Sequence, residues 1–173
     1  VAEKGASAVI VEDEVDAPKD RTVIRVPDTR YALALMSAAY FGYPADKLKV
    51  IGITGTKGKT TTTYMVKAIL EEVGHKVGLI GTIEAIIGDK TIPSNKTTEA
   101  IIGDKHIPAA NTTPESYTIH KYFAEMVEAG CDCVVMEVSS QGLMLHRTAG
   151  IPFTIGIFTN LGKDHIGPNE HKD

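Results

Sequence analysis

One stretch of this sequence decides its fold: Val50-Ile-Gly-Ile-Thr-Gly-Thr-Lys-Gly-Lys-Thr-Thr61. Apolar residues 50–54 predict a buried strand, and residues 59–73 predict a helix. A glycine-containing loop between a strand and a helix indicates a phosphate-binding loop, because its backbone N–H groups and the helix N-terminus attract an anion. The predicted phosphate contacts are Gly55, Thr56, Lys57, Gly58, Lys59, Thr60 and Thr61.

Two side chains of this loop predict nucleotide chemistry. Lys59 can reach the β- and γ-phosphates of ATP, and the Thr60 hydroxyl can ligate Mg²⁺. The strict loop pattern has glycine where this chain has Ile53, so the loop is a shorter variant. The alternative is a glycine turn in which the lysines are incidental.

Further short strands are predicted at residues 77–80, 131–138 and 153–158. Strand, helix and strand in this order form a βαβ unit, which favours parallel strands. We therefore expect an α/β fold in which a mostly parallel sheet is flanked by helices. Polar residues follow the carboxyl ends of these strands, which is where open α/β sheets bind ligands.

Two predicted helices of this fold each have an apolar face. The face of the helix after the loop comprises Met65, Val66, Ile69, Leu70 and Val73. The second helix is predicted to start at Thr113-Pro114-Glu115, with Thr113 as its N-cap, and to end at Gly130. Its apolar face comprises Ile119, Tyr122, Phe123, Met126 and Val127.

Three polar side chains that follow strands are candidates for chemistry. Glu137 ends a buried strand, where a carboxylate is costly unless it is hydrogen-bonded or binds a metal. Ser139 suits an oxyanion or sugar contact, with a turn or helix cap as the alternative. His165 suits a second metal ligand, with a solvated loop side chain as the alternative. Solvated side chains are expected for His75, His106, His120 and His171.

The first 46 residues predict a β-β-α segment. Strands are expected at 7–11 and 22–26, and a helix over about 30–41. Its apolar stripe comprises Ala32, Leu33, Met36, Ala39 and Tyr40. The segment is too small for a core of its own. We therefore expect residues 1–46 to end one domain and residues 47–173 to begin another, in a piece of a longer protein.

Residues 82–113 contain a tandem repeat with a period of 15. The sequence Glu84-Ala-Ile-Ile-Gly-Asp-Lys90 recurs at residues 99–105, and Ile92-Pro93 recurs at 107–108. Each copy predicts a hairpin with a Gly-Asp turn. Two copies are too few for a solenoid, so a local duplication in a surface hairpin is the favoured interpretation.

Composition argues against several classes of protein. A net charge of -4 disfavours nucleic acid as the main partner, and no apolar run is long enough to span a bilayer. Cys131 and Cys133 lie two apart in a predicted strand, where they are poorly placed to bridge each other, and they are expected to be buried free thiols.

Taken together, these segments resemble the Mur ligase family. The residues that carry the resemblance are Gly52–Thr62, Asn111–Ser116, Met136–Ser140, His146-Arg147 and Phe158–His165. The resemblance implies a three-domain ATP-dependent amide ligase of peptidoglycan precursor synthesis. Such an enzyme activates the peptide carboxylate of UDP-MurNAc-L-Ala-D-Glu as an acyl phosphate, which the amine of a diamino acid then attacks.

The resemblance also implies roles for individual residues. Residues 55–61 would hold the phosphates of ATP, and Lys59, Glu137 and His165 would be catalytic. The implied Mg²⁺ ligands are Thr60, Glu137 and His165. The implied contacts with the UDP-MurNAc-peptide are Asn111, Thr112, Thr113, Ser139 and Arg147. The implied protein is cytoplasmic and monomeric at full length, uses ATP and Mg²⁺, and neither binds nucleic acid nor inserts into a membrane.

This chain departs from the family pattern at several positions. Lys57, Gln141 and Leu145 stand where the family commonly has Asn, His and Gln, and the repeat has no counterpart. The second copy of the repeat keeps residues 111–116 intact, so we expect that copy to be the functional one. The family's carbamylated lysine and its amino-acid-binding domain would lie beyond Asp173, so we expect no complete ligation by this chain alone.

Two other functions remain open from the residues. A folylpolyglutamate-synthetase-like ligase would share the phosphate loop but respond to folate. A nucleotide-binding module without catalysis would bind ATP and not turn it over.

Overall fold

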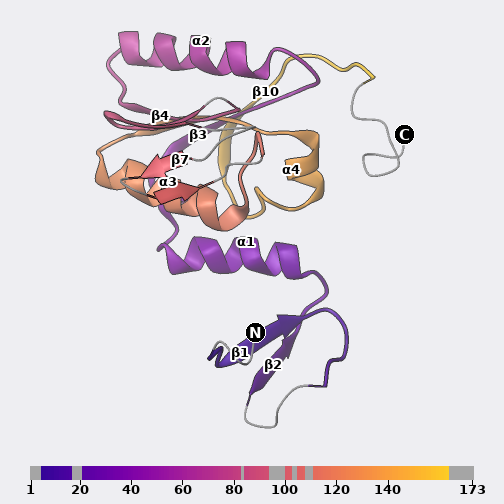
Figure 1. Cartoon of the computed structure of the whole chain (residues 1–173). Helices are drawn as coiled ribbons and strands as arrows, with labels where there is room; N and C mark the ends of the chain where they lie inside the picture. Colours follow the sequence, from indigo (N-terminus) through magenta and orange to yellow (C-terminus); the bar gives the residue numbers. More distant parts are fainter. Residues whose placement is uncertain are drawn as a thin grey trace.

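A computed structural model describes residues 5–16, 21–82, 84–93, 100–102, 105–107 and 111–163. Its main body has three layers, with helix α2 (Lys59–Glu72) on one face of a central sheet and helices α3 (Ser116–Glu128) and α4 (Ser140–Met144) on the other (Figure 1). Helix α1 (Thr29–Tyr40) lies below α3, and a small sheet lies beyond it. The predicted α/β class is confirmed.

Within the described residues the central sheet has six strands in the order β10-β3-β9-β4-β5-β6. Strands β10 (Phe153–Phe158), β3 (Lys49–Thr54), β9 (Cys133–Glu137) and β4 (Val77–Ile80) are mutually parallel, and β5 (Glu84–Ile87) and β6 (Lys90–Pro93) continue the sheet antiparallel. The carboxyl ends of the four parallel strands therefore meet at one edge.

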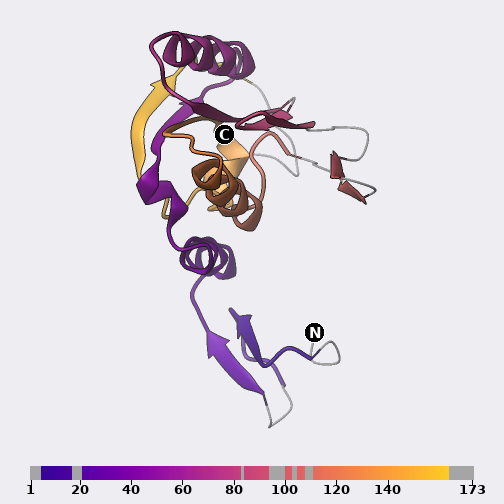
Figure 2. The same cartoon turned by 90° about the vertical axis from the view of Figure 1, so that its left-hand side faces the viewer.

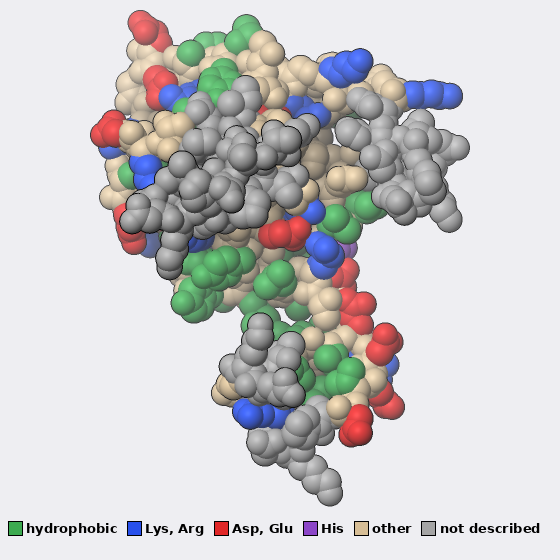
Figure 3. Space-filling view, viewed as in Figure 1, with side chains coloured by type: hydrophobic (Ala, Val, Ile, Leu, Met, Phe, Trp, Pro, Cys, Tyr) green, Lys and Arg blue, Asp and Glu red, His purple; other side chains and the backbone are tan. Residues whose placement is uncertain are grey.

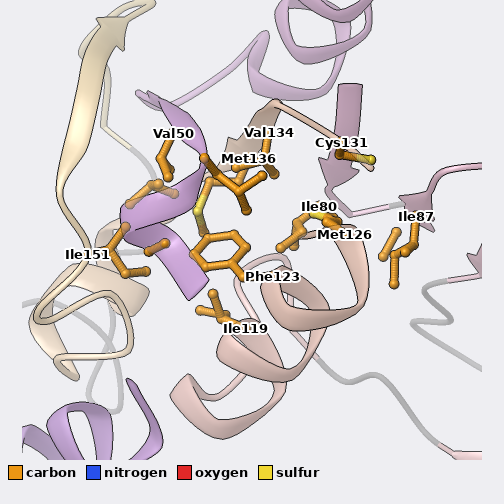
Figure 4. Close-up of a cluster of buried hydrophobic side chains, with 14 residues drawn as sticks. Val50, Ile80, Ile87, Ile119, Phe123, Met126, Cys131, Val134, Met136 and Ile151 are labelled. Atoms are coloured by element: carbon orange, nitrogen blue, oxygen red, sulfur yellow. The ribbon is translucent and has the colours of Figure 1, made fainter. Parts of the chain in front are cut away.

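Strand β9 runs through the centre of the core and is buried along its whole length. Because side chains alternate across a strand, Val134 and Met136 face α3, where they join a cluster around Phe123 (Figure 4). Cys133 and Val135 face α2 and join a second cluster. The same alternation places Glu137 on the α2 side. Cys131 and Cys133 are buried free thiols, as predicted.

Helix α2 uses only part of its predicted apolar face. Val66 and Leu70 pack on the sheet, but Met65, Ile69 and Val73 are exposed. The prediction was wrong for these three because the stripe that contacts the sheet runs through Thr63, which is fully buried. Helical spacing alone permits either stripe.

Helix α3 has the predicted apolar face, with Ile119, Phe123 and Met126 fully buried. Its start differs from the prediction, because Glu115 is the N-cap residue and Thr113 lies outside the helix. The Thr113 hydroxyl is instead buried against the end of β9. His120 on this helix is also fully buried, so the expected solvated side chain was wrong there. Helix α4 was not predicted.

The N-terminal segment forms strands β1 (Ala8–Val11) and β2 (Thr22–Arg25), which pair in parallel, followed by α1. The predicted stripe of α1 was wrong, since its buried residues are Ala34, Ser37 and Ala38. These small side chains pack against α3, which allows the two helices to approach closely. Larger side chains remain at the surface, where hydrophobic groups gather at the narrow part of the molecule (Figure 3).

Both copies of the repeat form hairpins, as predicted. The first copy is β5–β6, and the second is β7 (Ala100–Ile102) with β8 (Lys105–Ile107). The pairings Ala85↔Ile92 and Ala100↔Ile107 are equivalent, so the registers of the two hairpins match. Only the first pairs with β4, and the second projects beyond the sheet (Figure 2).

The remaining connections follow from local chemistry. A short 3₁₀ helix, η2 (Pro44–Lys47), links α1 to β3, with proline at its first turn.

None of the helices in the described part of the chain is long and apolar enough to cross a bilayer.

Candidate nucleotide and substrate site

The predicted phosphate loop connects β3 to α2 at the carboxyl edge of the sheet. Gly58 is the N-cap of α2 and has a φ of 82°, a left-handed conformation that favours glycine. The Lys59 ammonium donates to the carbonyl oxygens of Gly55, at 2.7 Å, and Thr56, at 3.1 Å. Lys59 thus lies folded over its own loop, and it would exchange these two acceptors for a phosphate if a nucleotide bound there.

The end of the neighbouring strand β10 holds the loop in place. The Asn160 side chain accepts a hydrogen bond from the Lys57 N–H at 3.1 Å and donates one to the Lys57 carbonyl at 3.0 Å. The Thr159 hydroxyl also donates to the Lys57 carbonyl, at 2.7 Å. These bonds use the Lys57 peptide and leave the N–H groups at the start of α2 to face an anion.

Glu137 approaches the loop from the other neighbouring strand, β9. Its carboxylate is buried and accepts a hydrogen bond from the Thr60 hydroxyl at 3.1 Å. The Thr82 backbone N–H donates to its other oxygen at 2.9 Å. The structure therefore brings together Thr60 and Glu137, the two predicted Mg²⁺ ligands that it describes. His165 lies outside the described residues.

The predicted substrate residues Asn111, Thr112 and Ser139 are half-buried. Thr112 approaches the Glu137 carboxylate through the Thr82 hydroxyl, whose oxygen lies 3.1 Å from the Thr112 hydroxyl oxygen. Ser139 is the N-cap of α4 and accepts a hydrogen bond from the Gly142 N–H at 3.0 Å. The helix-cap alternative for Ser139 is therefore confirmed, and its contact with substrate stays a prediction.

Thr113 and Arg147 are buried and have partners within the protein. The Thr113 hydroxyl donates to the Glu137 carbonyl at 3.1 Å and accepts from the Ser139 N–H at 2.8 Å. The Arg147 guanidinium donates to the Thr113 carbonyl at 3.0 Å and pairs with Glu115 at 2.9 Å. In this structure both residues position the turn that carries Thr112, and their predicted contacts with substrate are not tested.

A cavity of about 250 Å³ joins the two groups of residues. Its lining combines the phosphate loop, the Thr112 turn, the start of α4 and the end of β10. The lining residues are Thr54, Gly55, Thr56, Lys59, Thr112, Ser139, Ser140, Phe158, Asn160, Leu161 and Gly162. A phosphate held by the loop would therefore share a cavity with a second ligand held at Thr112 and Ser139.

The donor atoms beside the loop fit a hard divalent cation. The Thr60 hydroxyl and the Glu137 carboxylate are both oxygen donors, which Mg²⁺ prefers. Burial of a carboxylate is costly unless it is compensated, and a bound cation adds to the compensation that its hydrogen bonds provide. These residues would hold Mg²⁺, which would neutralise phosphate charge during transfer.

Two residues that contact this site were not among the predicted ones. Thr82 follows β4 and reaches Glu137, and Asn160 follows β10 and reaches the loop. Both obey the rule that polar residues after parallel strands surround the ligand site. The rule indicates this edge of the sheet but does not single out these two side chains among the polar residues there.

A phosphate loop between a buried parallel strand and a helix, with an acidic residue from the adjacent strand, defines an α/β protein of the phosphate-loop class. Residues 53–173 match the Mur ligase middle domain. The chain belongs to the Mur ligase family.

Curated relatives of this chain include two ligases from clostridia. It is 51% identical over 163 residues to the UDP-N-acetylmuramoyl-L-alanyl-D-glutamate–2,6-diaminopimelate ligase of Clostridium perfringens, covering 94% of this chain and 31% of the relative. It is 48% identical over 167 residues to the ligase of the same name from Clostridium tetani, covering 95% of this chain and 31% of the relative. The chain thus spans about a third of the length of these relatives.

A solved structure of a UDP-N-acetylmuramoyl-L-alanyl-D-glutamate–2,6-diaminopimelate ligase has the same fold. The TM-score is 0.72 at 22% sequence identity, over 97% of this chain and 31% of the solved chain. At this level of identity the similarity concerns the fold alone.

Proposed function

We propose that this chain provides the ATP-binding part of a ligase that joins 2,6-diaminopimelate to UDP-MurNAc-L-Ala-D-Glu. The substrates are those in the names of its curated relatives. The observation that carries the proposal is the single cavity shared by the phosphate loop and by Thr112 and Ser139. Such a cavity lets a carboxylate and the terminal phosphate of ATP meet without solvent between them.

The proposed chemistry is the one that the family resemblance implies, and the positions of the loop and Glu137 support it. The substrate carboxylate attacks the γ-phosphorus, the bond to ADP breaks, and an acyl phosphate forms. The amine then attacks the acyl carbon, phosphate leaves and the amine loses a proton. Lys59 would stabilise charge on the transferring phosphoryl group, and Thr60 and Glu137 would hold Mg²⁺ beside it.

Binding of Mg²⁺ with ATP to the chain is the first test. Isothermal titration calorimetry should show binding that depends on Mg²⁺ and that weakens at least tenfold in Lys59→Met. Glu137→Gln should lower the dependence on Mg²⁺ and retain some nucleotide affinity, because it removes a charge and preserves the shape of the side chain. Absence of nucleotide binding by the wild-type chain would contradict the proposal.

The second test separates a ligase from the alternatives. Phosphate release that requires both ATP and UDP-MurNAc-L-Ala-D-Glu would support the ligase, and a response to folate would support a folylpolyglutamate synthetase. Tight ATP binding by the full-length protein without turnover would support a non-catalytic module. We propose that the 173-residue chain alone forms no amide product, because its relatives are about three times longer.

The proposal includes the setting of the reaction. Both ATP and UDP-linked sugar precursors are cytoplasmic metabolites, so we place the protein in the cytoplasm. We propose a monomer at full length, which sedimentation velocity measurements would test.

A further inference from the structure

Thr82 lies between Glu137 and Thr112 and contacts both of them. It follows strand β4, and its backbone N–H donates to Glu137 Oε1 at 2.9 Å. Its hydroxyl oxygen lies 3.0 Å from Glu137 Oε2 and 3.1 Å from the Thr112 hydroxyl oxygen. Gly81 permits this approach, because a Cβ atom at that position would lie 2.7 Å from Glu137 Oε1.

The chemistry of these groups decides which of them donates. A carboxylate only accepts, whereas a threonine hydroxyl carries one hydrogen. Thr82 therefore cannot donate to Glu137 and Thr112 at once. The bond to the carboxylate is the stronger one because it is charge-assisted, so Thr82 donates to Glu137 and accepts from Thr112.

The result is a chain of hydroxyl groups directed at one carboxylate oxygen. Thr112 donates to Thr82, and Thr82 donates to Glu137 Oε2, which also accepts from Thr60. In this arrangement the Thr112 hydrogen is used within the protein. Thr112 can then offer only lone pairs to a ligand in the cavity.

We infer that Thr82 couples the nucleotide side of the cavity to the Thr112 side by reversing the direction of this hydrogen-bond chain. When Glu137 Oε2 serves as a cation ligand, as the proposed function on which this inference rests requires, it becomes a poorer acceptor. The Thr82 hydrogen then turns to Thr112. Thr112 is released to donate to an acceptor oxygen, such as that of a carboxylate or carbonyl substrate.

This coupling has a direction and a consequence for binding. A ligand that needs a donor at Thr112 binds more tightly after cation and nucleotide are in place. By linkage, the same ligand raises the affinity for cation and nucleotide by the same factor. Thr82 is thus a positioning residue, because it acts through Glu137 and Thr112.

Solution NMR of the chain labelled in threonine methyl groups tests the inference. The probe is Mg²⁺ with ADP, which lacks the terminal phosphate that would otherwise approach Thr112 directly. The Thr112 methyl signal should shift on binding in the wild type and in Thr82→Ser, which keeps the hydroxyl. In Thr82→Val the shift should be severalfold smaller, although backbone amides of residues 58–61 still respond.

The Thr82→Val variant keeps the N–H bond to Glu137 and a similar shape, so Glu137 stays in place. An undiminished Thr112 shift in this variant would overturn the inference. So would a wild-type chain whose loop amides respond to the probe but whose Thr112 signal does not. If the wild-type loop amides do not respond, the proposed function itself fails. Thr82→Ala serves as a second hydroxyl-free variant if Thr82→Val does not fold.

Discussion

Single side chains at the carboxyl edge of the sheet show how tightly the phosphate loop is built. Gly55 has a φ of 130° and lies against the end of β10. A Cβ atom there would collide with the Thr159 hydroxyl and lie 2.9 Å from the Asn160 carbonyl oxygen. Gly58 also has a left-handed φ, but nothing lies within 4 Å of the position of its Cβ. A side chain at position 58 would therefore introduce backbone strain alone, whereas one at position 55 would introduce both backbone strain and a steric collision.

We predict that Gly55→Ala destabilises the protein more than Gly58→Ala. The Gly58 substitution adds only backbone strain, about 1–2 kcal/mol. The Gly55 substitution adds strain and displaces the segment that holds the loop, for a total of about 3 kcal/mol or more. Urea denaturation would measure both free energies of unfolding. Equal decreases in the free energy of unfolding would show that Thr159 and Asn160 can move away from the added methyl group without further destabilisation.

His120 is fully buried, and neither of its ring nitrogens has a hydrogen-bond partner among the described residues. Burial lowers its pKa below the usual 6.5. Above that pH the ring is neutral in both the folded and the unfolded chain. As the pH falls further, the unfolded chain binds a proton that the folded chain rejects, so the protein loses stability until the lower folded pKa is reached.

We predict that His120→Leu removes this part of the acid sensitivity. Leucine has a similar volume and does not titrate, so the difference in unfolding free energy between wild type and variant should change in the variant's favour as the pH falls below 6.5. Denaturation curves at several pH values would measure it. If the unfolding free energies of the two proteins changed in parallel with pH, protonation of His120 would not destabilise the folded state.

Among the elements, the two hairpins of the repeat have matching registers but different positions in the fold. Strand β4 pairs with β5 through Leu79↔Ile86 and Ile80↔Ala85. Ala100 and Ile101 of β7 are the repeats of Ala85 and Ile86, and both hairpins have the same register. The second copy was expected to be the functional one because it keeps residues 111–116 intact. In the structure the two copies have different positions. The first hairpin extends the central sheet, and the second precedes the turn that carries Thr112.

We predict that one copy of the repeat is dispensable. Deletion of residues 94–108 keeps the first hairpin, and deletion of residues 84–98 lets the second take its place beside β4. Each variant should unfold within about 1 kcal/mol of the wild type, because loop length changes closure entropy only slowly. Thermal denaturation would test both. Collapse of both variants would show that one copy is not sufficient. The two shortened chains differ only in carrying Thr91 or His106, so collapse of the second alone would be due to that side chain.

Across the molecule, a line of charged side chains joins the N-terminal segment to the main body. Arg147 after α4 pairs with Glu115 at the start of α3 at 2.9 Å. Glu115 also pairs with Arg30 of α1 at 3.3 Å. The Arg147 side chain is 7% exposed and the Arg30 side chain 48% exposed. Because Arg147 is buried and Arg30 is exposed, we expect the two arginines to contribute differently to the free energy of unfolding, although both pair with Glu115.

We predict that Arg147→Met costs about 1–3 kcal/mol of stability, because it leaves the buried Thr113 carbonyl without its donor. Arg30→Met should cost under about 1 kcal/mol, since exposed ion pairs contribute little. Chemical denaturation of both variants would compare them. A larger loss in the Arg30 variant would show that the junction with α1 depends on the surface pair.

Several features of the fold follow from the sequence because their causes are local. The apolar run of residues 131–138 predicts the burial of Cys131 and Cys133, and glycine chemistry between β3 and α2 predicts the phosphate loop. The buried face of α3 was also predictable, since only one stripe of this helix is apolar. On α1 and α2 the spacing allows more than one stripe, so the choice depends on which side chains fit against the neighbouring layer.

The phosphate loop and the mostly parallel sheet were therefore predictable from the residues along the chain, and the family resemblance implied that Glu137 and Thr60 act together. Thr82 beside Glu137, Asn160 beside Lys57 and the burial of Thr113 and Arg147 emerged only from the folded chain. The physical reason is the distance along the chain. Periodicity and loop chemistry depend on residues that are near neighbours in the sequence, whereas Thr82 and Glu137 are 55 positions apart and Lys57 and Asn160 are 103 positions apart. Strand order brings those residues to one edge.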